Sequence, residues 1–146
     1  MYFDDLHEGY RFETGTRTLT EADIVRFARE WDPQDFHLDA DAARQSPYGG
    51  LIASGFHTML TAFVLSLEAD VWKQASMGSP GMDDIRWLRP VRPGDTLKAE
   101  ATVLKSVPSA SRSDRGRTTI RYDVRNQSDE VVMTYTAIHI LRRRPV

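Results

Sequence analysis

The sequence predicts an α+β fold in which a curved antiparallel sheet wraps around one central apolar helix. The segment from Gly55 to Ala69 carries apolar side chains on nearly every side of a helix, so we expect it to be covered rather than laid on a surface. Residues 97–103 and 120–124 alternate apolar and polar side chains, as half-buried strands do. The last segment, 131–141, is apolar on both faces and β-branched, which indicates an interior strand.

The first half of the chain is expected to hold one short strand and two helices before the central one. The strand covers 11–19. Thr20 is then a good N-cap, with Asp23 three residues later, and Pro33 ends the helix because the residue before a proline is driven out of the α region. A short helix is expected within 38–48, ended by two glycines. Ser54 can cap the central helix.

The second half of the chain is expected to hold four strands and no helix. The first is a strand at 82–88, followed by the two alternating segments and the interior strand. A hairpin turn is predicted at 126–129 and a longer, mobile polar loop at 107–116. A single sheet around the central helix satisfies this order of elements, and no linker divides the chain, so we expect one domain over 1–146.

Composition limits the class of protein. With 19 basic and 21 acidic residues among 146, the chain has no electrostatic footprint for nucleic acid or for an anionic membrane. It has no cysteine, which excludes thiol nucleophiles, thiolate metal sites and disulfides. The acidic N-terminus does not resemble a signal peptide, and no apolar run reaches the length of a membrane span. We therefore expect a soluble cytoplasmic protein.

Several familiar active-site motifs are missing. The four histidines show no metal-ligand spacing, so no metal site is predicted. The residues around Ser54 lack the first glycine of the nucleophile elbow, and neither a phosphate loop nor a GxGxxG dinucleotide motif occurs. Nucleotide hydrolysis and dinucleotide-dependent redox chemistry are therefore not expected.

The stretch WDPQDFHLD places an acid, Asp32, five residues before an imidazole, His37. Asp32 follows the end of a helix, where the macrodipole disfavours negative charge, and such violations of local rules concentrate at functional sites. An acid and an imidazole so placed are candidates for general acid/base catalysis. The alternative is an Asp-Pro turn followed by a loop histidine with a structural role.

The start of the central helix offers a complementary feature. Backbone N–H groups in the first turn of a helix form an anion site, and Gly55 permits close approach of a ligand carbonyl. A thioester oxygen placed there would be stabilised as in an oxyanion hole. The alternative is that Ser54 is a cap and Gly55 a tight packing point.

With these features together, the chain resembles the MaoC-like dehydratases, relatives of the (R)-specific enoyl-CoA hydratases with a hotdog fold. Their motif runs Asp, any residue, Asn, Pro, any residue, His. Asp32 and His37 match its first and last positions, while Gln34 stands in place of Asn and Asp35 in place of Pro. Gln34 keeps a side-chain amide.

The resemblance continues into the central helix and beyond. GGLIASGFHT is similar to the family's entry to that helix, with Gly55 at the place of the oxyanion glycine and Ser54 where histidine is common. The segment IRWLRPVRPGD at 85–95 is similar to the strand and turn that follow. A serine found in the central helix of some hydratases has no clear match, since its place falls near Leu60.

The resemblance implies reversible addition of water across the α,β double bond of an acyl thioester. Asp32 and His37 would hold the water, and the Gly55 N–H would polarise the carbonyl. It implies a coenzyme A or acyl carrier protein thioester as substrate, no cofactor, and a homodimer or dimer of dimers with the site near its interface. The substrate-binding residues are expected to be Phe36, Ile52, Ala53, Ser54, Phe56 and Trp87.

Two other functions remain open. A hotdog acyl-CoA thioesterase would release free thiol, but that class usually places its acid on the central helix, and no Asp or Glu lies between Gly55 and Leu67. A non-catalytic domain would bind acyl-CoA without turnover.

Overall fold

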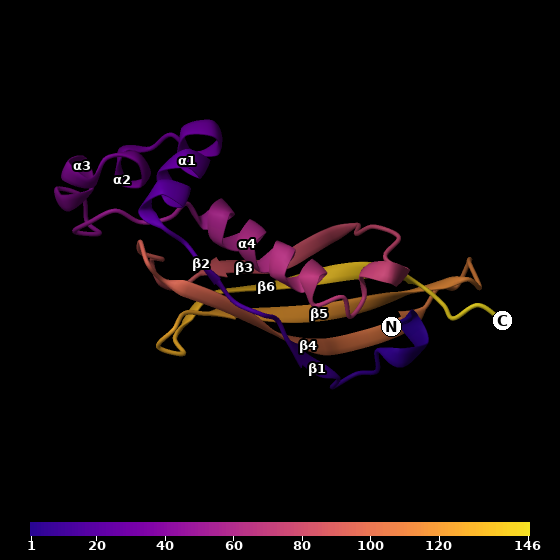
Figure 1. Cartoon of the computed structure of the whole chain (residues 1–146). Coiled ribbons are helices and arrows are strands. Elements are labelled where there is room, and N and C mark those ends of the chain that lie inside the picture. The colour runs from indigo at the N-terminus through magenta and orange to yellow at the C-terminus, as the bar shows by residue number, and fades with distance from the viewer.

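A computed structural model describes all residues, 1–146, and contains one antiparallel sheet with a long helix against it (Figure 1). The α-helices and strands are β1 (Arg11–Glu13), β2 (Arg17–Thr18), α1 (Glu21–Trp31), α2 (Asp35–Leu38), α3 (Ala40–Arg44), α4 (Gly55–Glu68), β3 (Gly81–Trp87), β4 (Thr96–Pro108), β5 (Arg115–Arg125) and β6 (Val131–Arg142). Short 3₁₀ helices cover Phe3–Asp5 and Lys73–Ala75. The predicted fold class is confirmed. None of these helices combines the length and apolar character needed to cross a bilayer.

The sheet runs in the order β1-β4-β5-β6-β3, with β2 paired separately to β4. The predicted interior strand is confirmed, since β6 lies between β5 and β3. β3 is an edge strand with one extra residue between Asp83 and Arg86, where the left-handed backbone of Asp84 (φ 52°) forms a bulge. β3 therefore presents a twisted outer edge that pairs with no other strand of the chain.

Helix α4 lies on one face of the sheet, and α1, α2 and α3 gather beyond its N-terminal end, opposite the two chain termini (Figure 1). Its sheet-facing side is formed by small or aliphatic residues, including Thr61, Ala62 and Leu65, which allow a close approach. The expectation that the helix is covered on nearly every side does not hold within one chain. Its outer face remains about half exposed, because the sheet curves around one side only. The exposed fractions on this face are 54% for Phe56, 46% for Leu60 and 44% for Phe63.

Some element boundaries differ from those expected. The strand predicted over 11–19 is divided into β1 and β2, because Thr14 uses its side chain to accept a hydrogen bond from Ala99 N. The short helix expected within 38–48 is α3, which the Asp39 carboxylate caps, and a single turn that was not predicted, α2, precedes it. β4 and β5 each extend two residues into the predicted loop at 107–116 and leave 109–114 between them. α1 and α4 begin at the predicted N-caps, Thr20 and Ser54.

Candidate active site

The candidate site forms where three segments meet beside the N-terminus of α4. Asp32 is the C-cap residue of α1, and His37 belongs to the single turn of α2. The extended segment 51–54 passes next to both and leads into α4. Its Ile52 N–H donates to Phe36 O at 3.1 Å, and its Ala53 N–H donates to Val91 O at 2.8 Å. The segment thus joins α2 to the connection between β3 and β4.

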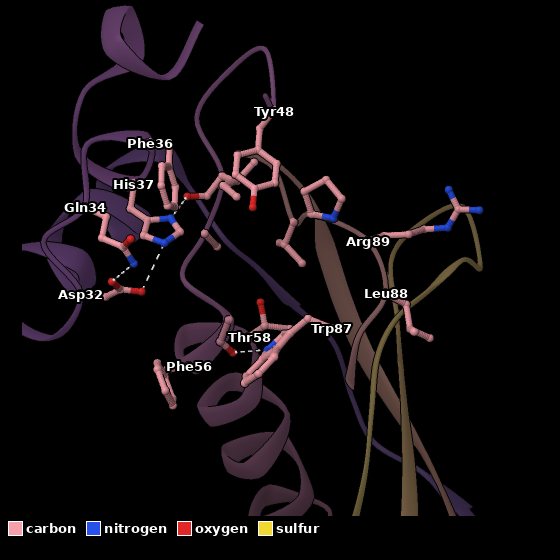
Figure 2. A pocket seen from close by; sticks show the side chains of 15 residues that line it. Asp32, Gln34, Phe36, His37, Tyr48, Phe56, Thr58, Trp87, Leu88 and Arg89 are labelled. Carbon is pink, nitrogen blue, oxygen red and sulfur yellow. Dashed lines mark hydrogen bonds and ion pairs between the residues drawn. The ribbon is translucent and has the colours of Figure 1, made fainter. Parts of the chain in front are cut away.

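Asp32 and His37 contact each other directly, with 3.2 Å between Asp32 Oδ2 and His37 Nε2 (Figure 2). His37 is buried, and its other ring nitrogen, Nδ1, lies 2.7 Å from Ile52 O. A carbonyl oxygen can only accept, so Nδ1 carries a proton. The other ring nitrogen, Nε2, faces the carboxylate.

The Asp32 carboxylate accepts hydrogen bonds from both sides. Gln34 Nε2 donates to Oδ1 at 2.7 Å and Ser54 Oγ donates to Oδ2 at 2.7 Å. Burial disfavours the charged form of Asp32, but these two bonds and the adjacent imidazole outweigh it and hold the pKa of Asp32 below its ordinary value. Asp32 is thus an ionised carboxylate at neutral pH, and the predicted amide at position 34 is a donor to it.

Gly55 begins α4, and its N–H donates to no acceptor within the chain. Trp87 Nε1 donates to Gly55 O at 2.9 Å. A Cβ on residue 55 would lie 2.5 Å from Trp87 Nε1, so a side chain there would displace the indole. The packing of Trp87 against the helix start therefore requires glycine at position 55. Close approach of a ligand to the free N–H would be a second reason for glycine there.

A cavity of about 440 Å³ lies in front of these groups. Figure 2 shows Asp32, Gln34 and His37 along one wall, with Trp87 and Leu88 across from them. Eight of its fifteen lining residues are hydrophobic, as in sites that bind an acyl group through apolar walls and a few placed polar groups.

The structure brings most of the predicted site residues to this cavity. Those that line it are Asp32, His37, Gly55, Phe36, Ile52, Ala53, Phe56 and Trp87. Ser54 is not among the lining residues, because its side chain is completely buried behind Asp32. The structure therefore does not place Ser54 on the wall of the site.

Three further lining residues that carry a polar group were not predicted from the sequence: Tyr48, Thr58 and Arg89. Thr58 lies one turn into α4, on the same side as Gly55, a spacing that the helical period already offered as a signal. Tyr48 comes from the loop after α3, packs against Phe36 with 5.3 Å between ring centroids, and carried no sequence signal. Arg89 extends from the cavity edge and pairs with Glu130 at 3.0 Å.

An antiparallel sheet of this order wrapped around a central helix is the hotdog fold that the sequence predicts. A family model described as the MaoC like domain matches residues 6–131. The chain therefore belongs to the MaoC-like domain family, whose members include hydratases.

Individual relatives agree with this placement. The uncharacterised protein YdeM of Bacillus subtilis is 31% identical over 129 residues, which cover 88% of this chain and 90% of YdeM. An (R)-specific enoyl-CoA hydratase of Rhodospirillum rubrum is 31% identical over 112 residues, 73% of this chain and 72% of that enzyme. The crystal structure of a MaoC-like dehydratase from Rhodospirillum rubrum superposes with a TM-score of 0.94 at 41% identity, covering 100% of this chain and 99% of the other.

Proposed function

We propose that this protein is a hydro-lyase that adds or removes water across the α,β double bond of an acyl thioester, in the manner of enoyl-CoA hydratases and 3-hydroxyacyl-CoA dehydratases. The main support is the contact between Asp32 Oδ2 and His37 Nε2, at the cavity that also holds the free N–H of Gly55. The similarity to the (R)-specific enoyl-CoA hydratase supports the same reaction class.

The hydrogen bonds around Asp32 and His37 support separate roles for the two groups. Gln34 and Ser54 stabilise the ionised form of Asp32. For hydration, His37 would carry a proton at Nε2 in addition to the one at Nδ1. The pair would then supply a carboxylate base and an imidazolium acid, the two roles that addition of water requires.

In the hydration direction, Asp32 takes a proton from water as its oxygen bonds to the β-carbon of the substrate. The double-bond electrons move toward the thioester carbonyl, whose oxygen accepts a hydrogen bond from the Gly55 N–H. His37 Nε2 then delivers its proton to the α-carbon. Transfer of a proton from Asp32 back to His37, across the 3.2 Å contact, restores the starting state. Each acid or base typically contributes about 10²–10⁴ in rate, and an oxyanion donor about 10²–10³.

The proposed substrate is an acyl-CoA or acyl carrier protein thioester, with no further cofactor. The thioester carbonyl itself receives the electrons, so the reaction needs no other electron sink. The apolar lining of the cavity suits an acyl group, and Asp32, Gln34 and His37 lie together along one of its walls. Phe36, Ile52 and Ala53 would contact the substrate beside them.

We also propose that two copies associate through the outer face of α4 and the free edge of β3. Phe56, Leu60 and Phe63 on α4 and Trp87 on β3 are all between 44% and 54% exposed. A half-exposed apolar surface beside an unpaired strand edge is a typical interface. Phe56 and Trp87 also line the cavity, so a second copy placed there would adjoin the site.

The reaction is tested with crotonyl-CoA and longer enoyl thioesters by loss of the enoyl thioester absorbance. Asp32→Asn and His37→Ala should each lower the rate by about 10²-fold or more. Asp35→Asn and His7→Ala change the same residue types at exposed positions and should retain the wild-type rate. Full activity in Asp32→Asn or His37→Ala would refute the assignment.

A thiol-reactive dye in the same assay separates the competing functions. A hydratase conserves the thioester, whereas a thioesterase releases thiol at the rate of turnover. A binding domain would instead show thermal stabilisation by the thioester without any change in absorbance.

A further inference from the structure

Ser54 lies between the Asp32 carboxylate and the free N–H of Gly55. It precedes Gly55, which carries the free N–H, and its own side chain is completely buried. Its hydroxyl donates to Asp32 Oδ2 at 2.7 Å and accepts from Phe56 N–H at 3.3 Å. A serine hydroxyl has one proton, and Ser54 has committed it to Asp32. Ser54 therefore has no donor left for a substrate.

We propose that Ser54 is a positioning residue, which holds the Asp32 carboxylate at a fixed position relative to the Gly55 N–H at the start of α4. The inference rests on the proposed function and assigns Ser54 a role different from substrate contact. Asp32 belongs to the end of α1, whereas Gly55 begins α4, so the spacing of base and oxyanion donor depends on what joins these elements. The Ser54–Asp32 bond spans 22 residues of sequence and joins them directly.

Asp32 makes no other direct hydrogen bond to segment 51–54. Gln34 also donates to the carboxylate, but it lies two residues away on the same connection and moves with Asp32. The Asp32 N–H donates to Ala28 O within its own helix. His37 is anchored independently, through Nδ1 to Ile52 O. Removal of the Ser54 hydroxyl would thus leave Asp32 joined to segment 51–54 only indirectly, through its contact with His37 Nε2.

The same hydrogen bond has an electrostatic effect. A donor to an ionised carboxylate favours the charged form, so its loss raises the pKa of Asp32. A base that must be ionised loses activity as the pH falls through its pKa, so the acid limb of the pH–rate profile should move to higher pH. A role in substrate binding would instead raise KM and leave this limb unchanged.

The test is Ser54→Ala, assayed for enoyl thioester hydration as a function of pH. We expect kcat to fall by about 10- to 100-fold, the effect of one hydrogen bond to a charged group, with KM within about twofold of wild type and the acid limb shifted upward. Thr20→Ala is the matched control, since it removes an equivalent helix-cap hydroxyl from α1 away from the cavity. It should lower thermal stability without moving the acid limb. Ser54→Thr keeps the hydroxyl, so the acid limb of its pH–rate profile should stay at the wild-type pH.

Titration of the Asp32 carboxyl carbon by ¹³C NMR provides a readout that needs no turnover, with Asp32→Asn used for assignment. The Asp32 pKa should be higher in Ser54→Ala than in wild type. An unchanged Asp32 titration, or a raised KM with unchanged kcat, would overturn the positioning role. Failure of the wild-type protein to hydrate any enoyl thioester would instead refute the proposed function, and the NMR comparison would still report whether Ser54 controls Asp32.

Discussion

His139 should make the stability of this protein sensitive to mild acid. It lies on the buried side of β6, 6% exposed, with its Nε2 3.0 Å from the Tyr122 hydroxyl and its ring 4.3 Å from that of Trp72, measured between centroids. No carboxylate contacts it. Burial penalises the imidazolium and lowers the pKa of His139 from 6.5 to about 4. The folded state therefore holds this side chain neutral at pH values where the unfolded chain protonates it.

The sign and size of the effect follow from linkage. Since the folded pKa is the lower one, the unfolded state binds more protons as the pH falls, and stability decreases between about pH 6.5 and pH 4. With these two values, the free energy of unfolding should fall by about 2 kcal/mol between pH 7 and pH 5, and by about 3 kcal/mol in total below pH 4. This is a large part of the roughly 5–15 kcal/mol that stabilises an ordinary domain.

Urea unfolding of the wild type and His139→Gln at pH 7, 6 and 5 measures this quantity. Glutamine keeps a hydrogen-bonding side chain but does not titrate. The difference in unfolding free energy between the two proteins should therefore shift by about 2 kcal/mol in favour of the variant on going from pH 7 to pH 5. Parallel pH profiles would refute the reasoning, because all other titrating groups are shared.

Two further substitutions test the packing at the site and the proposed association. Gly55→Ala should displace the Trp87 indole and remove its hydrogen bond, which should lower stability by about 1 kcal/mol. Tryptophan fluorescence should change and turnover should fall. Unchanged fluorescence and rate would contradict the contact. Leu60→Glu on the outer face of α4 should convert a dimer to monomers, as measured by light scattering. Leu104→Glu changes a similarly exposed leucine on β4 and should leave the dimer intact. An unchanged mass for Leu60→Glu would place the interface elsewhere.

Local patterns accounted for the helices and strands well. The N-caps Thr20 and Ser54 are where α1 and α4 begin, since a cap is a short-range hydrogen bond between a side chain and a backbone group three or fewer residues away. Alternation located β4 and β5, and a β-branched run that is apolar on both faces located β6, for the same reason: both patterns depend on neighbouring residues alone. The division of the first strand at Thr14 was missed because it depends on a hydrogen bond from Ala99, which is distant in sequence.

In the candidate site, too, features set by neighbouring residues were predicted from the sequence, and contacts between distant residues were not. The pair Asp32 and His37 was recognisable from spacing and from resemblance, and the free N–H of Gly55 from its place in a first helical turn. The roles of Ser54 and Trp87 were not, because each depends on a contact across 22 or 32 residues of chain. A sequence pattern records which groups can cap, pair or alternate locally. Which donor reaches the Asp32 carboxylate, and which ring covers Gly55, is settled by the packing of α1, α4 and β3 against one another.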